Sequence, residues 1–400
     1  MKQNFDWPLM KSNFNRQDLD DVIQHLQQED PKLTHGPKVR DFEQAWSSWL
    51  GVKHSIMVNS GASANDISML MVREKYGVGE IIVPGLTWVS DIASVIHAGH
   101  TPVFVDINPR TLSMNSDEVA EVINSKTKAV FLTHVLGLNG LSDSLVSLLR
   151  EKNIALIEDV CESHGATHNG KKVGTFGEIS NFSFYYAHHI TTIEGGMICT
   201  NDDSIAEMAR MMRSHGLVRE ISNPEIKKGI IEKYPDLNPD FIFAYAAHNM
   251  RPTEINGILG LAQLRRLDSC IEQRRLNFKK FLDILDKEVF FSDFETDGNS
   301  NYAFILVLKE SSFILRDKIE KILNEAGIEF RRGLSGGGNQ LRQPYLKDLK
   351  NLPSPDTLKV TEHVHNFSWY LGNYPELDWS FFARLEDVFV KIKGAYQLIM

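Results

Sequence analysis

The sequence predicts an α/β protein whose large domain contains a mostly parallel sheet covered by helices. Short runs rich in β-branched residues alternate along the first half of the chain with longer amphipathic stretches. This alternation is typical of parallel sheets, whose strands are joined by helical crossovers. The expected strands are residues 81–83, 102–105, 129–132, 155–157 and 197–200, and helices are expected between them, for example at 117–124 and 141–152.

A second αβ block follows a long helical region at residues 254–281. Its first expected strand is the apolar run at 301–308, and a helix is expected at 314–326. We therefore place a domain boundary near residue 275, which gives a large domain over 31–275 and a small C-terminal αβ domain over 276–400. The proline-containing stretch at 221–247 has no clear period and is expected to be a surface excursion.

Composition and charge exclude several classes of partner. The 400 residues are 42% apolar, enough for a large core, and a net charge of −9 with a pI near 5.9 provides no basic surface for nucleic acid. No apolar run approaches the ~18–20 residues needed to cross a bilayer, and the N-terminus lacks the apolar stretch of a signal peptide. Three scattered cysteines, Cys161, Cys199 and Cys270, suggest a reducing compartment and are too few for a four-thiolate iron–sulfur cluster. We expect a cytoplasmic protein with no membrane or nucleic-acid partner.

Two local patterns are compatible with ligand binding. A turn of small residues at 59–65 opens a helical stretch, so backbone N–H groups near Gly61, Ala62 and Ser63 are available to an anion. An ordinary helix cap has the same pattern. Asp159 ends an apolar strand, where open α/β sheets bind ligands, although a carboxylate that only caps the next helix also fits. We find no convincing metal-binding motif.

The run from Phe182 to Gly196 resembles the lysine segment of the DegT-type sugar aminotransferase family. These enzymes use pyridoxal 5′-phosphate (PLP) to put amino groups on sugars of bacterial surface polysaccharides. The family pattern is F-S-x-x-x-x-K-x-I-T-x-x-E-G-G, and this chain has His188 at the lysine position. The resemblance extends from Pro8 to about Tyr374 and implies PLP fold type I, the aspartate aminotransferase fold. It also implies that residues 1–30 form an N-terminal segment packed on the small domain.

The resemblance implies a phosphate site shared between two subunits. It assigns the cofactor phosphate to the turn at Gly61, Ala62 and Ser63, with a hydroxyl from Ser183. Asn249 matches the asparagine that reaches the phosphate of the neighbouring subunit. A homodimer with shared active sites is the expected assembly.

Three further positions match residues that hold the pyridine ring. Asp159 matches the acid on the ring nitrogen, which keeps the ring protonated as an electron sink. Trp88 matches the aromatic side chain that stacks on the ring face. Glu162 falls where the family usually has a glutamine on the ring hydroxyl, and this departure is shared with the histidine-bearing sugar dehydratases of the family.

Substrate contacts are expected from other motifs of the family, at His215, Arg251 and Arg331. The glycine-rich stretch at 333–338 is expected to be either a mobile surface loop or a lid over the substrate. Ala247-His248 replaces the family's Gly-Tyr before Asn249, so the substrate side of that loop differs from relatives that bind nucleotide-linked sugars. His189 is expected to be a packing residue, not the base.

Histidine at position 188 changes what the cofactor site can do. Imidazole, with a reference pKa of ~6.5, moves protons near neutrality but cannot form the imine that tethers PLP to lysine. The sequence therefore predicts PLP, or its amino form pyridoxamine 5′-phosphate (PMP), held non-covalently, with His188 as the proton-transfer base. We expect a transaminase that uses glutamate to aminate a keto or aldehyde sugar for lipopolysaccharide, with an octulosonate among the candidates. The alternatives are a PMP-dependent 3-dehydratase of a 4-keto-6-deoxy nucleotide sugar, without an iron–sulfur cluster, and a non-catalytic PLP-binding regulator.

Overall fold

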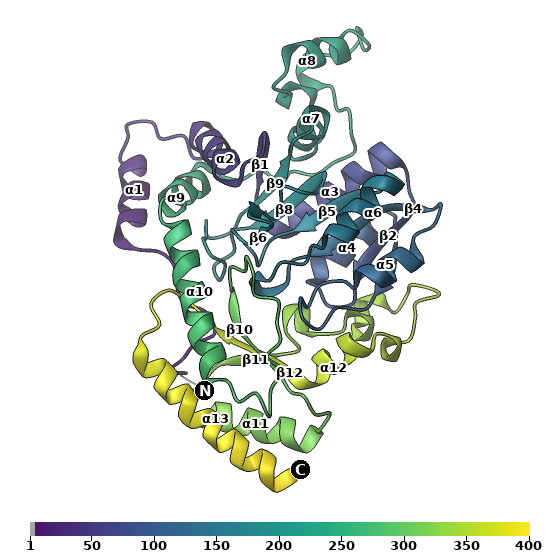
Figure 1. Ribbon diagram of the computed structural model, residues 1–400. Helices are drawn as coiled ribbons and strands as arrows, with labels where there is room; N and C mark the ends of the chain where they lie inside the picture. The colour runs from purple at the N-terminus through teal and green to yellow at the C-terminus, as the bar shows by residue number, and fades with distance from the viewer. Residues whose placement is uncertain (1–4) are drawn as a thin grey trace.

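The computed structural model describes residues 5–400, and its large domain is built on a seven-stranded sheet. Figure 1 shows this sheet with helices packed around it. Six strands run in the same direction, and β9 runs antiparallel to both of its neighbours. Across the sheet, the strands are β1 (His54–Val58), β9 (Gly196–Thr200), β8 (Ile179–Ser183), β5 (Ala155–Asp159), β4 (Thr127–Thr133), β2 (Glu80–Pro84) and β3 (Thr101–Val105). This confirms the predicted fold class.

Helices cover both faces of this sheet. One face packs against α3 (Gly61–Tyr76), α4 (Val89–His97) and α7 (Asp203–Met212). The other face packs against α2 (Pro37–Leu50), α5 (Ser116–Val122) and α6 (Asp143–Lys152). A short hairpin of β6 (Thr167–His168) and β7 (Lys171–Lys172) lies outside the sheet. Because each face buries its own apolar cluster, the carboxyl ends of the parallel strands are held rigidly at one edge.

The small domain has its own antiparallel sheet and core. The strands are β10 (Ala303–Val307), β12 (Ser368–Gly372) and β11 (Phe330–Arg332), and the helices are α11 (Phe313–Glu325), α12 (Lys359–Phe367) and α13 (Trp379–Ile399). In the part of the chain that the structure describes, no helix is long and apolar enough to span a bilayer.

One helix connects the two domains. The helical region expected at 254–281 divides at Arg265–Arg266 into α9 (Glu254–Leu264) and α10 (Leu267–Ile284). Leu267 and Ile271 of α10 are buried in the large-domain core, whereas Phe278 and Phe281 are buried in the small-domain core. The boundary that we place near residue 275 therefore falls inside a continuous helix.

The N-terminal segment contacts both domains. The ring of Trp7 is buried in the small-domain core, and its backbone N–H donates to Gly327 O at 3.1 Å. The helix α1 (Arg16–Leu26) instead packs against α9, where the Arg266 guanidinium holds Asp18 through two nitrogens at 2.6 and 2.5 Å. Only the first part of residues 1–30 thus lies on the small domain, and residues 1–4 are outside the described part of the chain.

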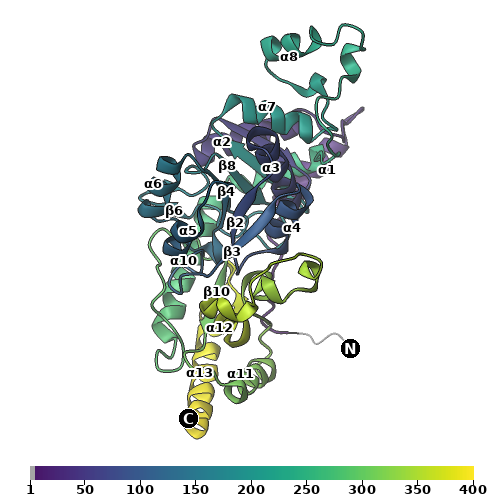
Figure 2. The same cartoon turned by 90° about the vertical axis from the view of Figure 1, so that its right-hand side faces the viewer.

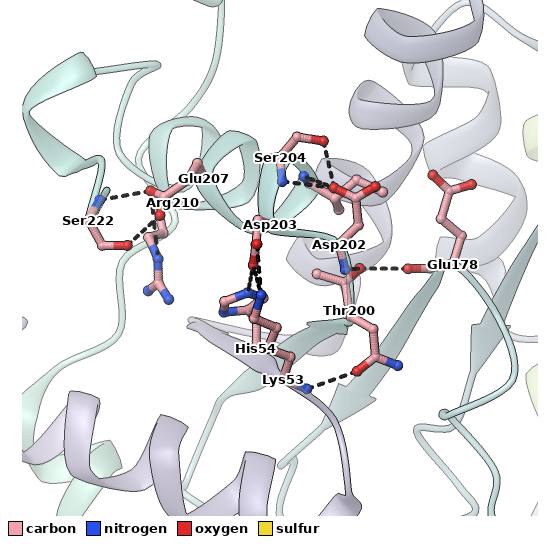
Figure 3. A network of polar contacts seen from close by, with 12 residues as sticks. Lys53, His54, Glu178, Thr200, Asp202, Asp203, Ser204, Glu207, Arg210 and Ser222 are labelled. Atoms are coloured by element: carbon pink, nitrogen blue, oxygen red, sulfur yellow. Dashed lines mark hydrogen bonds and ion pairs between the residues drawn. The ribbon is translucent and has the colours of Figure 1, made fainter. Parts of the chain in front are cut away.

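The stretch at 221–247, which contains α8 (Pro224–Ile231), projects from the large domain at the top of Figures 1 and 2. It exposes large apolar side chains, including Tyr234, Leu237 and Phe241. Figure 3 shows how the preceding helix α7 is fixed to the edge of the sheet, where Asp203 pairs with His54 at 2.6 Å. The first residue of α7 is therefore fixed to the edge strand β1.

Candidate active site

A small enclosed corner forms where α3 begins beside the end of β8. Ser60 caps α3 by accepting the Ser63 backbone N–H at 3.0 Å. A Cβ at Gly61 would lie 2.6 Å from the Ser183 Cβ and 3.0 Å from its Oγ, so only glycine leaves this space free. The corner combines a helix N-terminus with a serine hydroxyl, which are groups that bind phosphate. It contains the predicted phosphate residues Gly61, Ala62, Ser63 and Ser183.

Filling this corner is expected to weaken cofactor binding. Gly61→Val would push a branched side chain into Ser183, with an overpacking cost of about 1–3 kcal/mol. We expect PLP affinity, measured by absorbance titration, to fall by about one to two orders of magnitude. Gly394→Ala is a matched control, because a Cβ at Gly394 meets nothing within 4 Å. Equal PLP affinity in Gly61→Val and the wild type would show that the phosphate lies elsewhere.

Asp159 ends β5 in a buried polar network. Its Oδ1 accepts the Cys161 backbone N–H at 2.8 Å, and its Oδ2 accepts from Asn65 Nδ2 at 3.2 Å. The same Asn65 nitrogen donates to Asp91 Oδ1 at 2.7 Å. Sequence reasoning missed Asn65 and Asp91, because both lie inside helices where a polar residue signals nothing by itself. Burial and the charge of Asp159 raise the pKa of Asp91 well above its usual value.

Glu162 connects the strand ends to the small domain. Its Oε2 accepts the Leu136 backbone N–H at 3.0 Å, and its Oε1 accepts from Ser335 Oγ at 3.2 Å. Burial, with the nearby charge of Asp159, raises the pKa of Glu162 to about 7. This carboxyl can therefore be neutral or charged near physiological pH, whereas a glutamine amide would be neutral at every pH.

Ser335 belongs to the glycine-rich stretch at 333–338, which is docked on the large domain. A Cβ at Gly336 would lie 2.0 Å from Thr87 O, and Gln340 N donates to Gly85 O at 2.9 Å. The stretch is therefore packed against the large domain and is not a loose surface loop. Its glycines permit this packing, because they let two backbones approach closely. Trp88 follows Thr87 directly and keeps 54% of its surface exposed, so a ring face is open for stacking.

His188 lies in the loop after β8 and is only 8% exposed. Its ring centroid is 5.5 Å from that of Tyr302, 5.9 Å from that of His164 and 6.1 Å from that of Tyr185. Burial, with the positive charge of Arg274, lowers the pKa of His188 to about 3. Its Nδ1 is buried and has no hydrogen-bond partner among residues 5–400. The ring is therefore neutral at physiological pH, and one of its two nitrogens carries no hydrogen.

His189 has a different environment. Its Nε2 lies 3.0 Å from Ser300 O, which fixes it as the donor and ties the ring to the start of the small domain. Burial lowers its pKa, as it does for His164. These contacts support a packing role for His189.

His215, predicted to contact substrate, and Asn249, predicted to reach the partner's cofactor phosphate, are both exposed, unlike this buried set. His215 is exposed, has φ of 62°, and donates its backbone N–H to His248 O at 2.8 Å. Asn249 is exposed on the adjacent strand segment, and its side chain accepts weakly from the Arg251 backbone N–H at 3.4 Å. This surface is open to a second chain.

Arg331 approaches the site from the small domain. Its guanidinium pairs with Glu329 at 3.2 Å, and β11 places Arg331 opposite Tyr370. Burial and the charge of Glu162 raise the pKa of Tyr370, while Arg331 opposes that shift. Tyr370 is thus the partner of Arg331 across the small-domain sheet. Tyr370 and Tyr302 were also missed, because lone tyrosines in apolar strands are usually core residues.

The arrangement fits PLP. The corner at Gly61 and Ser183 suits a phosphate, Asp159 is a buried carboxylate for a ring nitrogen, and Trp88 offers an open aromatic face. An unpartnered, neutral imidazole at His188 completes the set with a proton acceptor.

Comparisons with known proteins show the family of this chain. The model of the DegT/DnrJ/EryC1/StrS aminotransferase family matches residues 13–385. The GDP-4-keto-6-deoxy-D-mannose 3-dehydratase of Yersinia pseudotuberculosis is 32% identical over 394 residues, which are 97% of this chain and 98% of that protein. The GDP-perosamine synthase of Caulobacter vibrioides is 33% identical over 303 residues, which are 74% of this chain and 76% of that protein.

A solved structure is similar over nearly the whole chain. It is a GDP-4-keto-6-deoxymannose-3-dehydratase with a trapped PLP–glutamate geminal diamine, at a TM-score of 0.85 and 28% identity. The match covers 96% of this chain and 100% of that one. The similarity extends over both domains and the loop between β8 and β9.

Proposed function

This chain belongs to the DegT/DnrJ/EryC1/StrS aminotransferase family and is a PLP-dependent enzyme, and we propose that it removes the 3-hydroxyl group of a 4-keto-6-deoxy sugar for a bacterial surface polysaccharide. Glutamate is the proposed amino donor that converts the bound PLP to PMP. The observation that carries the proposal is His188, a buried and neutral imidazole at the position of the family's lysine.

Non-covalent contacts alone retain the cofactor in this proposal. When bound, PLP supplies an electron sink that stabilises negative charge on the neighbouring carbon. The start of α3 and Ser183 would hold the phosphate, Asp159 would accept a hydrogen bond from the ring nitrogen, and the exposed Trp88 would cover a ring face. Imidazole cannot form an imine, so release of the cofactor depends only on these contacts.

His188 moves the protons. With the cofactor bound, the neutral ring would accept a proton from the carbon that bears the amino nitrogen, and burial beside Arg274 makes the protonated ring a strong acid. The proton then passes to the departing 3-hydroxyl group, which leaves as water. A transaminase would instead return the proton to the carbon that receives nitrogen.

Two observations favour dehydration over transamination, which the sequence alone led us to expect. The dehydratase of Yersinia pseudotuberculosis aligns over 97% of this chain, whereas the perosamine synthase aligns over 74%. Glu162 is a titrating carboxyl in place of the family's usual glutamine, with a pKa of about 7. Transamination is the second candidate, supported by the perosamine synthase, and it uses the same glutamate step.

Replacement of Glu162 by glutamine is expected to change the pH dependence of turnover. Wild-type Glu162 is protonated below about pH 7 and charged above it, so kcat/KM should show an inflection there. Glu162→Gln is neutral at every pH and should lack that inflection. Above about pH 7, where wild-type Glu162 is charged, kcat/KM of the wild type should change by about tenfold per pH unit relative to that of the variant. The exposed Glu151→Gln serves as a control that keeps it. An unchanged inflection in Glu162→Gln would assign it to another group.

We also propose that the enzyme is a homodimer with shared sites. Asn249 and His215 lie on neighbouring exposed segments, next to the apolar projection that bears Tyr234, Leu237 and Phe241. In a dimer, these groups are free to reach a partner's phosphate site. A monomer in analytical ultracentrifugation at assay concentration would contradict this arrangement.

Following the nitrogen of glutamate tests the proposed reaction. The protein is incubated with PLP, ¹⁵N-glutamate and a panel of keto and aldehyde sugars, including 4-keto-6-deoxy nucleotide sugars and an oxidised octulosonate. Dehydration releases the label as ammonia and leaves a sugar one oxygen lighter. Label in the sugar would replace the proposal with transamination. Failure to form 2-oxoglutarate would support a non-catalytic regulator.

A further inference from the structure

A second buried carboxyl stands beside the acid that serves the cofactor ring. Asp91 on α4 is 0% exposed and Asp159 is 3% exposed. Within residues 5–400, neither forms an ion pair, and their polar contacts are hydroxyl, amide and backbone groups. Two adjacent carboxylates without a cation cannot both stay charged in such a site.

One amide group bridges the two carboxyls. The Asn65 side-chain nitrogen lies 2.7 Å from Asp91 Oδ1 and 3.2 Å from Asp159 Oδ2, so both oxygens approach the same atom. Two charged carboxylates held this close repel each other in a buried site. A proton on one of the two carboxyls removes that repulsion.

The surroundings place that proton on Asp91. Its Oδ2 accepts from Thr133 Oγ1 at 2.8 Å and from Thr87 Oγ1, which are neutral donors. Asp159 instead accepts a backbone N–H from the turn after β5, at Cys161. Burial and the charge of Asp159 both raise the pKa of Asp91.

The other titratable groups around the pair do not supply a positive charge. Cys161 lies beside Asp159, and burial, with the charge of Asp159, raises its pKa. Burial also raises the pKa of Tyr345, and Glu162 lies near Asp159. All of these groups are neutral or acidic, so they strengthen the need for a neutral Asp91.

We propose that Asp91 is a positioning residue for the cofactor ring, a neutral carboxylic acid that donates its proton to Asp159 and is held in place by Asn65, Thr87 and Thr133. This donor orients the Asp159 carboxylate and draws off part of its negative charge. Asp159 is then a weaker proton acceptor toward the ring nitrogen than an isolated buried carboxylate, which moderates the electron sink. The proposal rests on the cofactor site of the proposed function, but not on the fate of the sugar.

The protonated acid is measurable in the apoprotein. Infrared difference spectra of protein labelled with ¹³C-aspartate are expected to show the C=O band of a carboxylic acid at about pH 7.5, where ordinary aspartates are ionised. Asp91→Asn should remove that band. Absence of the band from the wild-type protein would overturn the proposal. This measurement on the wild type does not depend on whether the variant folds.

The pH dependence of stability provides a second readout. Since the folded state keeps a proton on Asp91 that the unfolded state loses above about pH 4, wild-type stability should fall as pH rises from there. Asp91→Asn lacks this penalty, so its Tm relative to wild type should increase by about 2 °C or more between about pH 5 and about pH 8. Ser68→Ala, which removes a buried hydrogen bond of 2.8 Å from α3, the helix that carries Asn65, should give a difference independent of pH.

A pH-independent Tm difference for Asp91→Asn would show a structural role only and would overturn the proposal. Both measurements use protein without sugar substrate. Failure of the proposed dehydration therefore leaves their outcome unchanged, and failure here leaves the sugar reaction untouched.

Discussion

His188→Asn is expected to lower sugar turnover by about two to four orders of magnitude while PLP remains bound. Asparagine is close to imidazole in polarity but cannot accept and return a proton near neutral pH. The phosphate corner at Gly61 and Ser183 does not involve His188, so cofactor affinity should change little. Turnover is measured by the release of 2-oxoglutarate and of dehydrated sugar, and binding by absorbance titration.

His189→Asn is the matched control for this prediction. His189 is adjacent and also buried, and asparagine can still donate to Ser300 O, which the imidazole contacts at 3.0 Å. We expect less than about a tenfold effect on turnover, since no proton transfer is lost. Retained activity in His188→Asn together with a large loss in His189→Asn would reassign the base to His189.

Asp159→Asn is expected to have opposite effects on function and stability. Loss of a charge-assisted contact of about 1.5–3 kcal/mol should weaken PLP binding by about one to two orders of magnitude. The electron sink is weakened as well, so turnover should fall further. The apoprotein should become more stable at neutral pH, because the variant removes a buried negative charge that has no ion-pair partner among residues 5–400.

Calorimetry of the apoprotein and PLP titration measure these two effects separately. Asp202→Asn is a suitable control, since Asp202 caps α7 on the surface, far in sequence from β5. That variant should lose a little stability and keep PLP affinity. A loss of both stability and affinity in Asp159→Asn would mean that its carboxylate is mainly structural.

The sequence was informative about the fold wherever apolar runs coincided with strands. The five strands expected in the large domain correspond to β2, β3, β4, β5 and β9. β8 was missed because Ser180 and Asn181 interrupt its apolar pattern, although both are buried and hydrogen-bonded, Ser180 to Gly174 O at 2.7 Å and Asn181 to Ser68 at 2.8 Å. Periodicity cannot reveal polar groups whose partners come from distant segments.

The candidate site was predictable only where a continuous motif exists. His188, Asp159 and Ser183 were found through the family resemblance, and the structure brings their elements together at the strand ends. Asp91 and Tyr370 belong to no such motif, because their importance depends on tertiary neighbours. The stretch at 333–338 has the composition of a flexible loop, but glycine also permits the close backbone contact with Thr87 that the structure shows.

The central claim, that His188 moves the protons, is tested most directly by hydrogen exchange at the α-carbon of glutamate. PLP-loaded protein is incubated with glutamate in D₂O, and loss of the α-proton signal is followed by NMR. The wild type is expected to exchange this hydrogen readily, and His188→Asn at a rate lower by at least about a hundredfold. Equal exchange in the two proteins would contradict the account, because another group would then be moving the proton.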